Sequence, residues 1–388
     1  MPHPALMSQS RIGPSTPGSN FVEYKKKYRW KPRFNKKTAI ALDRPRHPFL
    51  VQLLARLSQL LCPMPDFTLK TYSAGIPKLP QRLDGLILVQ LSDIQCYEYA
   101  PAAYWEKMIR AVEALDPDII VVTGDVIHHG ETYLKQAHDI LAALPKIKSD
   151  GVTPVERLLC MGNHDYMDHA HADEQVSGKV SKGKLFRQVA KKAGFKVLVD
   201  NAIRLGFGQD ITAGIRKASE SDGHSALLEG LWVSGIDDYE HLLSTGKKLE
   251  EACEDALRQI PENAAHLLLT HNPHPDIINQ MSRNARKAPG LILAGHMHGG
   301  QIASRLPLLG PLLDSLRRRV MEGPFDDTYL QGAYHLDKAS ALYVNPGIGS
   351  SIRIDRFGLN LFPLRLGSTP EITRFILHPA ISASLKPS

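Results

Sequence analysis

The stretch LLCMGNHD at residues 158–165 joins four apolar residues directly to a group that carries polar side chains. The apolar part has the length and composition of a short buried strand. The polar part begins with Gly162, which permits a sharp turn, and then offers an amide, an imidazole and a carboxylate. Such side chains directly after a strand are typical of α/β sheets, whose ligands bind beyond the carboxyl ends of the strands.

The same arrangement recurs at four other places along the chain. The other polar groups are LSDIQ at 91–95, TGD at 123–125, THNP at 270–273 and GHMHGGQ at 295–301. Each group follows an apolar run and contains Asp, Asn or His. Because the ends of parallel strands meet along one edge of a sheet, we expect the five groups to converge on one site.

Apolar runs alternate with amphipathic stretches from residue 86 onward, which predicts sheets covered by helices. Strands are expected at 86–91, 119–123, 158–161, 231–233, 266–270, 291–294, 341–344 and 372–377. Helices are expected at 102–115, 132–144, 184–193, 249–259 and 275–284. The sequence therefore predicts an α/β fold.

Charge is concentrated at the start of the chain. Of 388 residues, 43% are hydrophobic and 22% charged, which is typical of a globular protein and excludes a fibrous or wholly disordered chain. The formal net charge is +7, but residues 1–46 hold 11 bases and 2 acids, which leaves the remainder at −2. The remainder lacks the positive field that gripping a nucleic-acid duplex requires, so no nucleic-acid partner is expected.

Three segments follow from these patterns: a basic mobile N-terminal arm at 1–46, an amphipathic helix and linker at 47–83, and the α/β domain at 84–388. The helix, at 48–61, places leucines at helical spacing. It either packs on the core or lies in the plane of an anionic membrane surface, to which the basic arm would be attracted.

The location expected from sequence is cytoplasmic, including the inner face of the membrane. No apolar run reaches the roughly 18 residues of a spanning helix, and the first residues lack a signal core. The four cysteines form no C-x-x-C pair and are expected to be reduced thiols.

The five polar groups offer oxygen and imidazole ligands, and cysteine does not dominate among them. Such ligands suit a hard or borderline divalent ion. The groups are numerous enough for two ions, since a carboxylate can bridge two cations. A pair of cations about 3.5–4 Å apart can clamp a phosphate and polarise a water molecule between them.

The chain contains, in this order, the motifs D-x-Q, G-D, G-N-H-D, H-N-P and G-H-M-H-G-G-Q. This ordered series resembles the pattern of the calcineurin-like metallophosphoesterase superfamily, and the resemblance runs from about residue 86 to residue 377. The family pattern is D-x-H, G-D, G-N-H-D/E, H and G-H-x-H. The resemblance implies a two-sheet α-β-β-α sandwich, with residues 84–388 as a metallophosphoesterase domain. It also implies a hydrolase of phosphoric esters or anhydrides with two divalent metal ions, of which Mn²⁺ is the first expectation and Fe²⁺, Zn²⁺ and Mg²⁺ are alternatives.

The resemblance also implies a role for individual residues. The first ion would be held by Asp93, Gln95, Asp125 and His298, and the second by Asp125, Asn163, His271 and His296. Asp125 would bridge the two ions. His164 would act as the catalytic histidine, which stabilises the phosphoryl oxygens or protonates the leaving oxygen. Asp165 would orient His164.

Gln95 departs from the family pattern, which has histidine at this position. An amide oxygen is a neutral and weaker ligand than imidazole, so we expect a weakened first metal site. The alternative is a non-catalytic relative with one ion or none. His128, His129, His169 and His171 match no motif position and are expected at the rim of the pocket or on the surface.

The segments LPLLGPLL at 306–313, NPGIG at 345–349 and PEIT at 370–373 are similar to those of a bacterial subgroup of YkuE-, YaeI- and LpxG-type proteins. The apolar stretch 306–316 is followed by Arg317, Arg318 and Arg319, which would form a substrate-binding basic mouth on an acyl-chain groove; the alternative is an ordinary lid loop. Together these features favour a lipid-linked phosphodiester or pyrophosphate, as in the UDP-2,3-diacylglucosamine pyrophosphatases of lipid A synthesis. The alternatives are a phosphodiesterase of other substrates, a phosphoprotein or nucleotide phosphatase, and a membrane-bound scaffold.

Overall fold

The computed structural model describes residues 66–96, 102–128, 133–166, 182–206, 230–300, 328–349, 352–354, 359–361 and 368–388. Several predictions lie outside these residues: the basic arm, the helix at 48–61, the apolar stretch 306–316, the cluster Arg317–Arg319, and the histidines His129, His169 and His171. Among the described helices, none combines the length and the apolar character needed to cross a bilayer.

A seven-stranded sheet has the order β15-β1-β14-β2-β3-β4-β5. Its strands are β1 (Thr68–Pro77), β2 (Leu86–Leu91), β3 (Ile119–Thr123), β4 (Glu156–Cys160), β5 (Lys196–Leu198), β14 (Glu371–Ala380) and β15 (Ser384–Pro387). Strands β2 to β5 are parallel, and β14 is antiparallel to β2 but parallel to β1.

A six-stranded sheet has the order β10-β11-β9-β8-β7-β6. Its strands are β6 (Asn201–Leu205), β7 (Leu231–Gly235), β8 (Ala265–Leu269), β9 (Leu291–Ala294), β10 (Gly332–His335) and β11 (Ala341–Val344). Strands β7, β8, β9 and β11 are parallel, whereas the two edge strands are antiparallel to their neighbours. A separate antiparallel pair joins β12 (Ile352–Ile354) to β13 (Leu359–Leu361).

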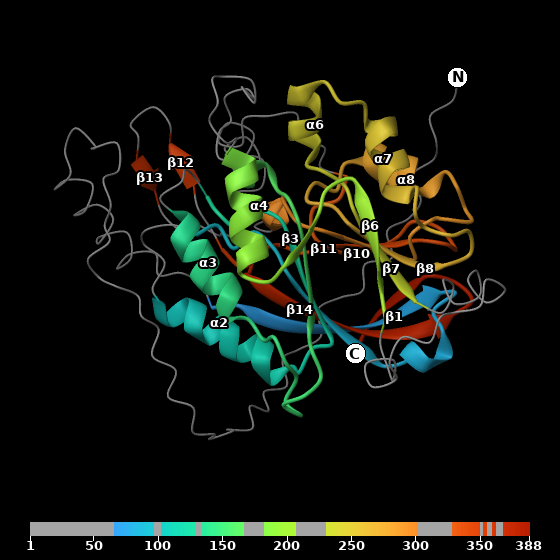
Figure 1. Ribbon diagram of the computed structural model, residues 1–388, viewed down its shortest axis with the longest axis horizontal. Coiled ribbons are helices and arrows are strands. Elements are labelled where there is room, and N and C mark those ends of the chain that lie inside the picture. Colours follow the sequence, from blue (N-terminus) through green and yellow to red (C-terminus); the bar gives the residue numbers. More distant parts are fainter. Residues whose placement is uncertain are drawn as a thin grey trace, which may run out of the picture. The chain divides into compact units, whose positions relative to one another are not determined.

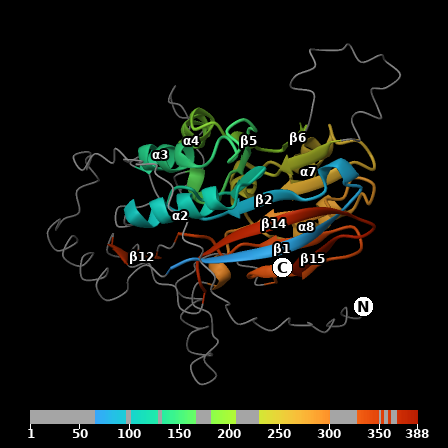
Figure 2. The same ribbon diagram turned by 90° about the horizontal axis from the view of Figure 1, so that it is seen from below.

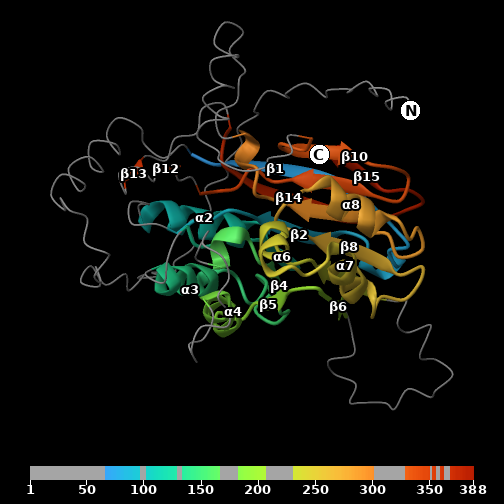
Figure 3. The same cartoon turned by 90° about the horizontal axis from the view of Figure 1, so that it is seen from above.

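Two groups of helices cover the outer faces of the sheets, as Figures 1 and 3 show. The helices α2 (Ala102–Ala114), α3 (Leu134–Ala143) and α4 (Lys182–Lys192) pack on the seven-stranded sheet. The helices α6 (Tyr239–Thr245), α7 (Leu249–Leu257) and α8 (Pro275–Ser282) pack on the six-stranded sheet. Three short 3₁₀ turns are η1 (Gln81–Leu83), η3 (Asn163–Tyr166) and η4 (His298–Gly300).

Strand β3 shows why the apolar runs predicted this fold. All five of its residues are buried. Because side chains alternate across a strand, Ile120 and Val122 face the helices while Ile119 and Val121 face the other sheet. A strand with both faces covered requires a continuous apolar run. The predicted two-sheet α-β-β-α sandwich is confirmed, and the five expected helices begin and end within two residues of their predicted limits.

Strand β1 differs from the prediction, because residues 68–77 lie in the segment expected to be a linker. The strand pairs along its whole length with β14, and Figure 2 shows it in blue between the red strands β14 and β15. Its Tyr72 side chain is 9% exposed, with ring centroids 4.9 Å from Tyr343 and 6.0 Å from Phe375. Polar residues at its start and Gly75 in its middle weaken the apolar signal on which the sequence prediction depended.

We expect Tyr72→Ala to lower the free energy of unfolding by about 3 kcal/mol, because the aromatic contacts of a buried ring are lost. Leu69→Ala on the same strand is the matched control, since Leu69 is 47% exposed and its loss should change stability by less than about 0.5 kcal/mol. Denaturant unfolding of both variants measures the difference. Equal effects would contradict the placement of β1 in the core.

Candidate metal centre

The ends of five strands meet where the two sheets are joined. Strands β2, β3 and β4 are neighbours in one sheet, and β8 and β9 are neighbours in the other. The Gln90 side-chain amide on β2 donates to Thr123 Oγ1 (3.0 Å) in its own sheet and to the Ala294 carbonyl (2.9 Å) in the other. The polar groups that follow these strands therefore come together, as the sequence predicted.

Asp125, His271 and His296 form the tightest group of predicted ligands. One potential donor atom from each lies within 4.8 Å of the others, and all three residues are buried. His271 Nε2 is 3.2 Å from Asp125 Oδ2 and 3.1 Å from His296 Nδ1. Two imidazoles and a carboxylate are a donor set that suits a transition-metal ion.

Asn163 adds an oxygen to this group. Its Nδ2 donates to Glu240 Oε2 at 3.2 Å, whereas its buried Oδ1 accepts no hydrogen bond among the described residues. Buried amide oxygens are nearly always paired, so this oxygen fits a cation ligand. Glu240 thus binds the amide nitrogen and leaves Oδ1 available as a ligand.

Asp93, Gln95 and His298 form a second group. His298 Nε2 lies 2.9 Å from Gln95 Nε2 and 3.5 Å from Asp93 Oδ1. The buried Asp93 Oδ1 accepts no hydrogen bond from the described residues, while Oδ2 accepts from Ser92 Oγ (2.5 Å) and the His296 N–H (3.0 Å). This last bond joins the two groups. We name the seven residues of both groups the metal centre.

Five of the seven residues have left-handed backbone conformations, which cost about 1–3 kcal/mol each in residues other than glycine. The values of φ are 48° at Asp93, 46° at Gln95, 52° at Asp125, 68° at His296 and 47° at His298. Backbone strain of this kind persists only where the surroundings fix it, and it gathers at functional sites.

Two glycines of the sequence motifs leave room for Asp125 and His271. A Cβ atom at Gly162 would lie 2.2 Å from Asp125 Oδ1, and one at Gly124 would lie 2.6 Å from His271 Nδ1. Gly124 also has a φ of 83°. The glycines of G-D and G-N-H-D are therefore required by close packing around the ligands.

The centre is electrostatically coupled. Burial would raise the pKa of Asp125, but His271 and His164 hold that pKa well below its usual range. Burial would likewise lower the pKa of His271, yet the Asp125 carboxylate raises it well above its usual value. Burial raises the pKa of Asp93 to about 6 and lowers that of His296 to about 3, the latter with help from His271.

His164 lies at the mouth of the centre. Its side chain is 19% exposed, and its Nε2 is 3.9 Å from Asp125 Oδ2. Its ring is oriented by the carbonyl of His128, which lies 2.7 Å from Nδ1. His128 was expected at the rim or surface, but it is 4% exposed and its ring centroid lies 5.1 Å from that of His164.

Asp165 does not orient the His164 ring in the way the sequence led us to expect. Its carboxylate accepts hydrogen bonds from backbone N–H groups instead: those of Asp125 (2.9 Å), Val126 (2.9 Å), Ile127 (3.3 Å) and Gly162 (2.9 Å). A buried carboxylate needs such donors, and the loops after β3 and β4 offer them. Asp165 therefore fixes the backbone that carries Asp125.

The turn into α6 was missed by the sequence interpretation. Asp238 is buried, caps α6 by accepting from the Glu240 (3.0 Å) and His241 (3.1 Å) N–H groups, and has a pKa raised by burial to about 8. Tyr166 of η3 donates to Asp237 and stacks on His241 at 3.6 Å. The signal was present, because the acidic pair directly follows strand β7, as the other polar groups follow theirs.

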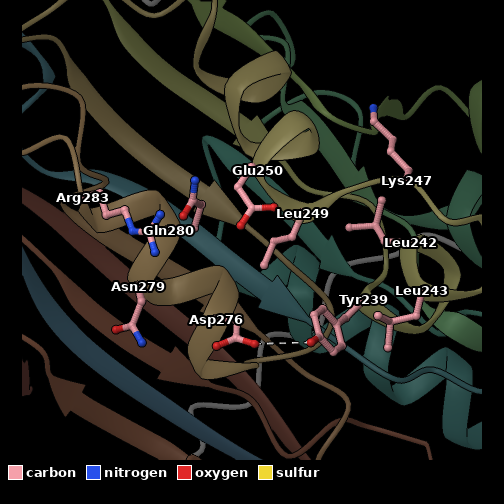
Figure 4. A pocket seen from close by; sticks show the side chains of 10 residues that line it. All are labelled: Tyr239, Leu242, Leu243, Lys247, Leu249, Glu250, Asp276, Asn279, Gln280 and Arg283. Carbon is pink, nitrogen blue, oxygen red and sulfur yellow. Dashed lines mark hydrogen bonds between the residues drawn. The ribbon is translucent and has the colours of Figure 1, made fainter.

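Six further residues singled out in the sequence have no described position. His129, His169 and His171 lie outside the described residues, as Arg317, Arg318 and Arg319 do. A cavity of about 350 Å³ between α6, α7 and α8 contains none of the predicted ligands, as Figure 4 shows. Tyr239 in its wall donates to Asp276 at 3.4 Å.

Comparison with known proteins relates this chain to metallophosphoesterases. A family model described as calcineurin-like phosphoesterase matches residues 87–300, which is more than half of the chain and includes all seven residues of the metal centre. The metallophosphoesterase YkuE of Bacillus subtilis (strain 168) is 27% identical over 302 residues, covering 77% of this chain and 81% of that protein.

Two further relatives have different descriptions, one as a pyrophosphatase and the other as a transmembrane protein. The UDP-2,3-diacylglucosamine pyrophosphatase LpxG of Chlamydia trachomatis is 26% identical over 317 residues, which cover 77% of this chain and 85% of that protein. A transmembrane protein with metallophosphoesterase domain from Bos taurus is 26% identical over 314 residues, which cover 80% of this chain and 57% of that protein. The chain thus matches little more than half of the bovine relative.

Metal binding should release protons, because imidazole and carboxylate ligands must be deprotonated. The Asp125 carboxylate raises the pKa of His271 well above its usual value, so binding of an ion should expel a proton from this imidazole and weaken as the pH falls. Below pH about 6 the Asp93 proton must also leave, so the loss of affinity should steepen. Calorimetric Mn²⁺ titration in buffers of different ionisation enthalpy, at pH 7.5 and 5.5, measures this release. Affinity that rises on acidification would contradict it.

Gln95→His should strengthen the group of Asp93, Gln95 and His298 as a metal site. We expect the weaker of two Mn²⁺ affinities to rise on the order of tenfold, the size of effect that even groups outside the ligand shell have. Metal content after dialysis, with His298→Ala as the variant that should lose this ion, measures the change. Two equally and fully filled sites in both the wild type and Gln95→His would show that the glutamine does not weaken the site.

Proposed function

We propose a substrate and a mechanism for this chain, which belongs to the calcineurin-like phosphoesterase family and is a hydrolase that acts on phosphate esters. The proposed reaction is hydrolysis of a phosphodiester or pyrophosphate bond in a lipid-linked substrate at a membrane surface. The proposed cofactors are two divalent ions, with Mn²⁺ as the first choice. The first candidate substrate is UDP-2,3-diacylglucosamine.

The observation that carries this proposal is the shared position of Asp125. Its Oδ2 faces His271 at 3.2 Å, and its Oδ1 accepts from the His164 backbone N–H at 2.9 Å. Asp93 is joined to the same centre through the His296 N–H at 3.0 Å. A carboxylate has two oxygens and can bridge two cations, so we propose that Asp125 bridges the ions of the two groups.

Bound at these residues, two cations would lower the pKa of water and neutralise charge on the phosphoryl oxygens. The protein's own contribution begins at His164, whose Nδ1 is fixed by the His128 carbonyl and whose Nε2 faces the centre. Because Nδ1–H is given to that carbonyl, His164 must be an imidazolium to carry a proton on Nε2; in that form Nε2–H can donate to a phosphoryl oxygen or protonate the leaving oxygen. Asp165 keeps the two loops rigid by accepting from their backbone N–H groups.

Two considerations favour a lipid-linked substrate. LpxG, whose name gives UDP-2,3-diacylglucosamine as its substrate, matches this chain over most of its length. The sequence also offers a basic arm and a leucine-rich helix that suit an anionic interface, with Arg317, Arg318 and Arg319 proposed to bind the substrate. The proposed location is the inner face of the cytoplasmic membrane. The similarity to YkuE favours the alternative, a phosphodiesterase with another natural substrate.

A Mn²⁺-supplemented assay should distinguish the two substrates. The protein is offered UDP-2,3-diacylglucosamine in mixed micelles and, separately, a bis-aryl phosphodiester. We expect release of UMP and a lipid monophosphate from the first, because the centre attacks a phosphoric anhydride. Asn163→Ala should reduce turnover at least about 100-fold, since loss of a metal ligand should cost no less than the 10–100-fold attributed to outer-shell partners.

The controls separate substrate from mechanism. Turnover of the aryl diester alone would support the alternative substrate class and leave the metal centre in place. No turnover of either compound, with two Mn²⁺ ions bound per chain, would overturn the proposed activity. Full activity in Asn163→Ala would overturn the proposed ligand set.

A further inference from the structure

Two sequence motifs that supply no ligand meet beside the metal centre. The segment NPGIG at 345–349 follows strand β11 of the six-stranded sheet, and the segment PEIT at 370–373 begins strand β14 of the other sheet. The Glu371 N–H donates to the Gly347 carbonyl at 3.1 Å. The two motifs therefore form one structural unit across the sandwich.

Their polar side chains form a buried network. Asn345 Nδ2 donates to Thr373 Oγ1 at 2.9 Å, Thr373 Oγ1 donates to Glu371 Oε1 at 2.6 Å, and the Tyr343 hydroxyl donates to the same oxygen. All four residues are fully buried. Lys70, which is half exposed, lies 2.5 Å from Glu371 Oε2 and neutralises the carboxylate. A connected network of this kind costs little only while its members remain paired, so it fixes the position of Asn345.

From Asn345 the network continues to the backbone of a proposed metal ligand. Asn345 Oδ1 accepts from the Gly347 N–H at 2.7 Å, which sets the turn of the loop. The next two N–H groups of that loop donate to the residues after strand β2: Ile348 to the Ser92 carbonyl at 2.9 Å and Gly349 to the Asp93 carbonyl at 2.8 Å.

The 345–349 loop lies in close contact with the backbone that follows Asp93. A Cβ atom at Gly349 would lie 2.1 Å from the Ile94 carbonyl oxygen, so only glycine permits this approach. Asp93 has a left-handed φ of 48°, a conformation that needs external support. The two hydrogen bonds to consecutive carbonyls provide such support, because they fix the peptide planes on both sides of the strained turn.

We propose that Asn345, Thr373 and Glu371 are positioning residues: their buried hydrogen-bond network holds the 345–349 loop against Ser92 and Asp93 and thereby places the Asp93 carboxylate in the metal centre. This inference rests on the proposed role of Asp93 as a ligand. In this proposal the two motifs act together, because they tie the backbone of one proposed ligand, Asp93, to the packed sheets.

The test compares two substitutions at Thr373 in the full chain. Thr373→Val keeps the shape of the side chain but removes the hydroxyl that links Asn345 to Glu371, whereas Thr373→Ser keeps the hydroxyl. We expect the weaker Mn²⁺ affinity, measured by calorimetry on folded protein, to fall about tenfold in Thr373→Val and to stay near that of the wild type in Thr373→Ser. Tyr343→Phe removes one hydroxyl farther from the centre and is the milder variant should Thr373→Val fail to fold; it should shift the same constant in the same direction.

Two controls decide what a result means. Ile260→Ala, in a small apolar cluster with Trp232, destabilises the fold without touching the network and should leave Mn²⁺ affinity unchanged. An equal loss of affinity in Ile260→Ala and Thr373→Val would mean that the network affects only the stability of the fold, and it would overturn the inference.

The second control is Asp93→Ala, which should abolish the weaker Mn²⁺ site. If it does so while both Thr373→Val and Tyr343→Phe bind Mn²⁺ like wild type, the positioning role is wrong; if Asp93→Ala binds normally, the proposed ligand set itself is wrong.

Discussion

The structure depends on one buried interaction, the pairing of the Asp125 carboxylate with His271 at 3.2 Å. A charge with no access to water is tolerated only when partners surround it. Here the partners come from both sheets: His271 follows β8 of one sheet and donates through Nδ1 to the Thr123 carbonyl of the other at 2.8 Å. The histidine that stabilises the buried carboxylate therefore also links the two sheets. The same edge of the sandwich contributes to stability and holds the candidate metal centre.

The strain of the centre is offset by the sandwich around it. Left-handed turns at Asp93, Asp125 and His296 would relax in an isolated loop, but each follows a strand whose side chains are packed between two layers. Second-layer polar groups then remove the remaining freedom. Asp165 binds the backbone of Asp125, Glu240 orients the amide of Asn163, and the 345–349 loop holds Asp93. These three proposed ligands are therefore positioned by the fold itself, and such preorganisation would lower the cost of binding a cation.

The sequence predicted those features that leave a local pattern. Strands β2 and β3 were predicted because each is a mostly apolar run, with Gln90 and Thr123 as the polar residues, and the proposed ligands were singled out because they directly follow such strands. Strand β1 was missed because its polar first residues and Gly75 weaken the apolar pattern, and its pairing partner, with Thr68 opposite Glu371, is too remote in the sequence to reveal it. The positions and contacts of His128 and Asp165 were not predicted for a related reason. Both act through backbone groups, and a motif of side chains does not indicate which carbonyl or N–H group lies nearby. Glu240 could have been found, since its turn follows β7 as the ligands follow their strands.

The position of β14 has a consequence for synthesis on the ribosome. This strand, residues 371–380, lies between β1 and β2, both of which emerge far earlier during translation. Until β14 has been made, β1 and β2 each have an unpaired edge that neighbouring nascent chains can reach, and such edges favour intermolecular pairing. A strand translated late thus separates two strands translated early, so this sheet can close only after residues 371–380 have left the ribosome, and chaperones can act on the open form until then.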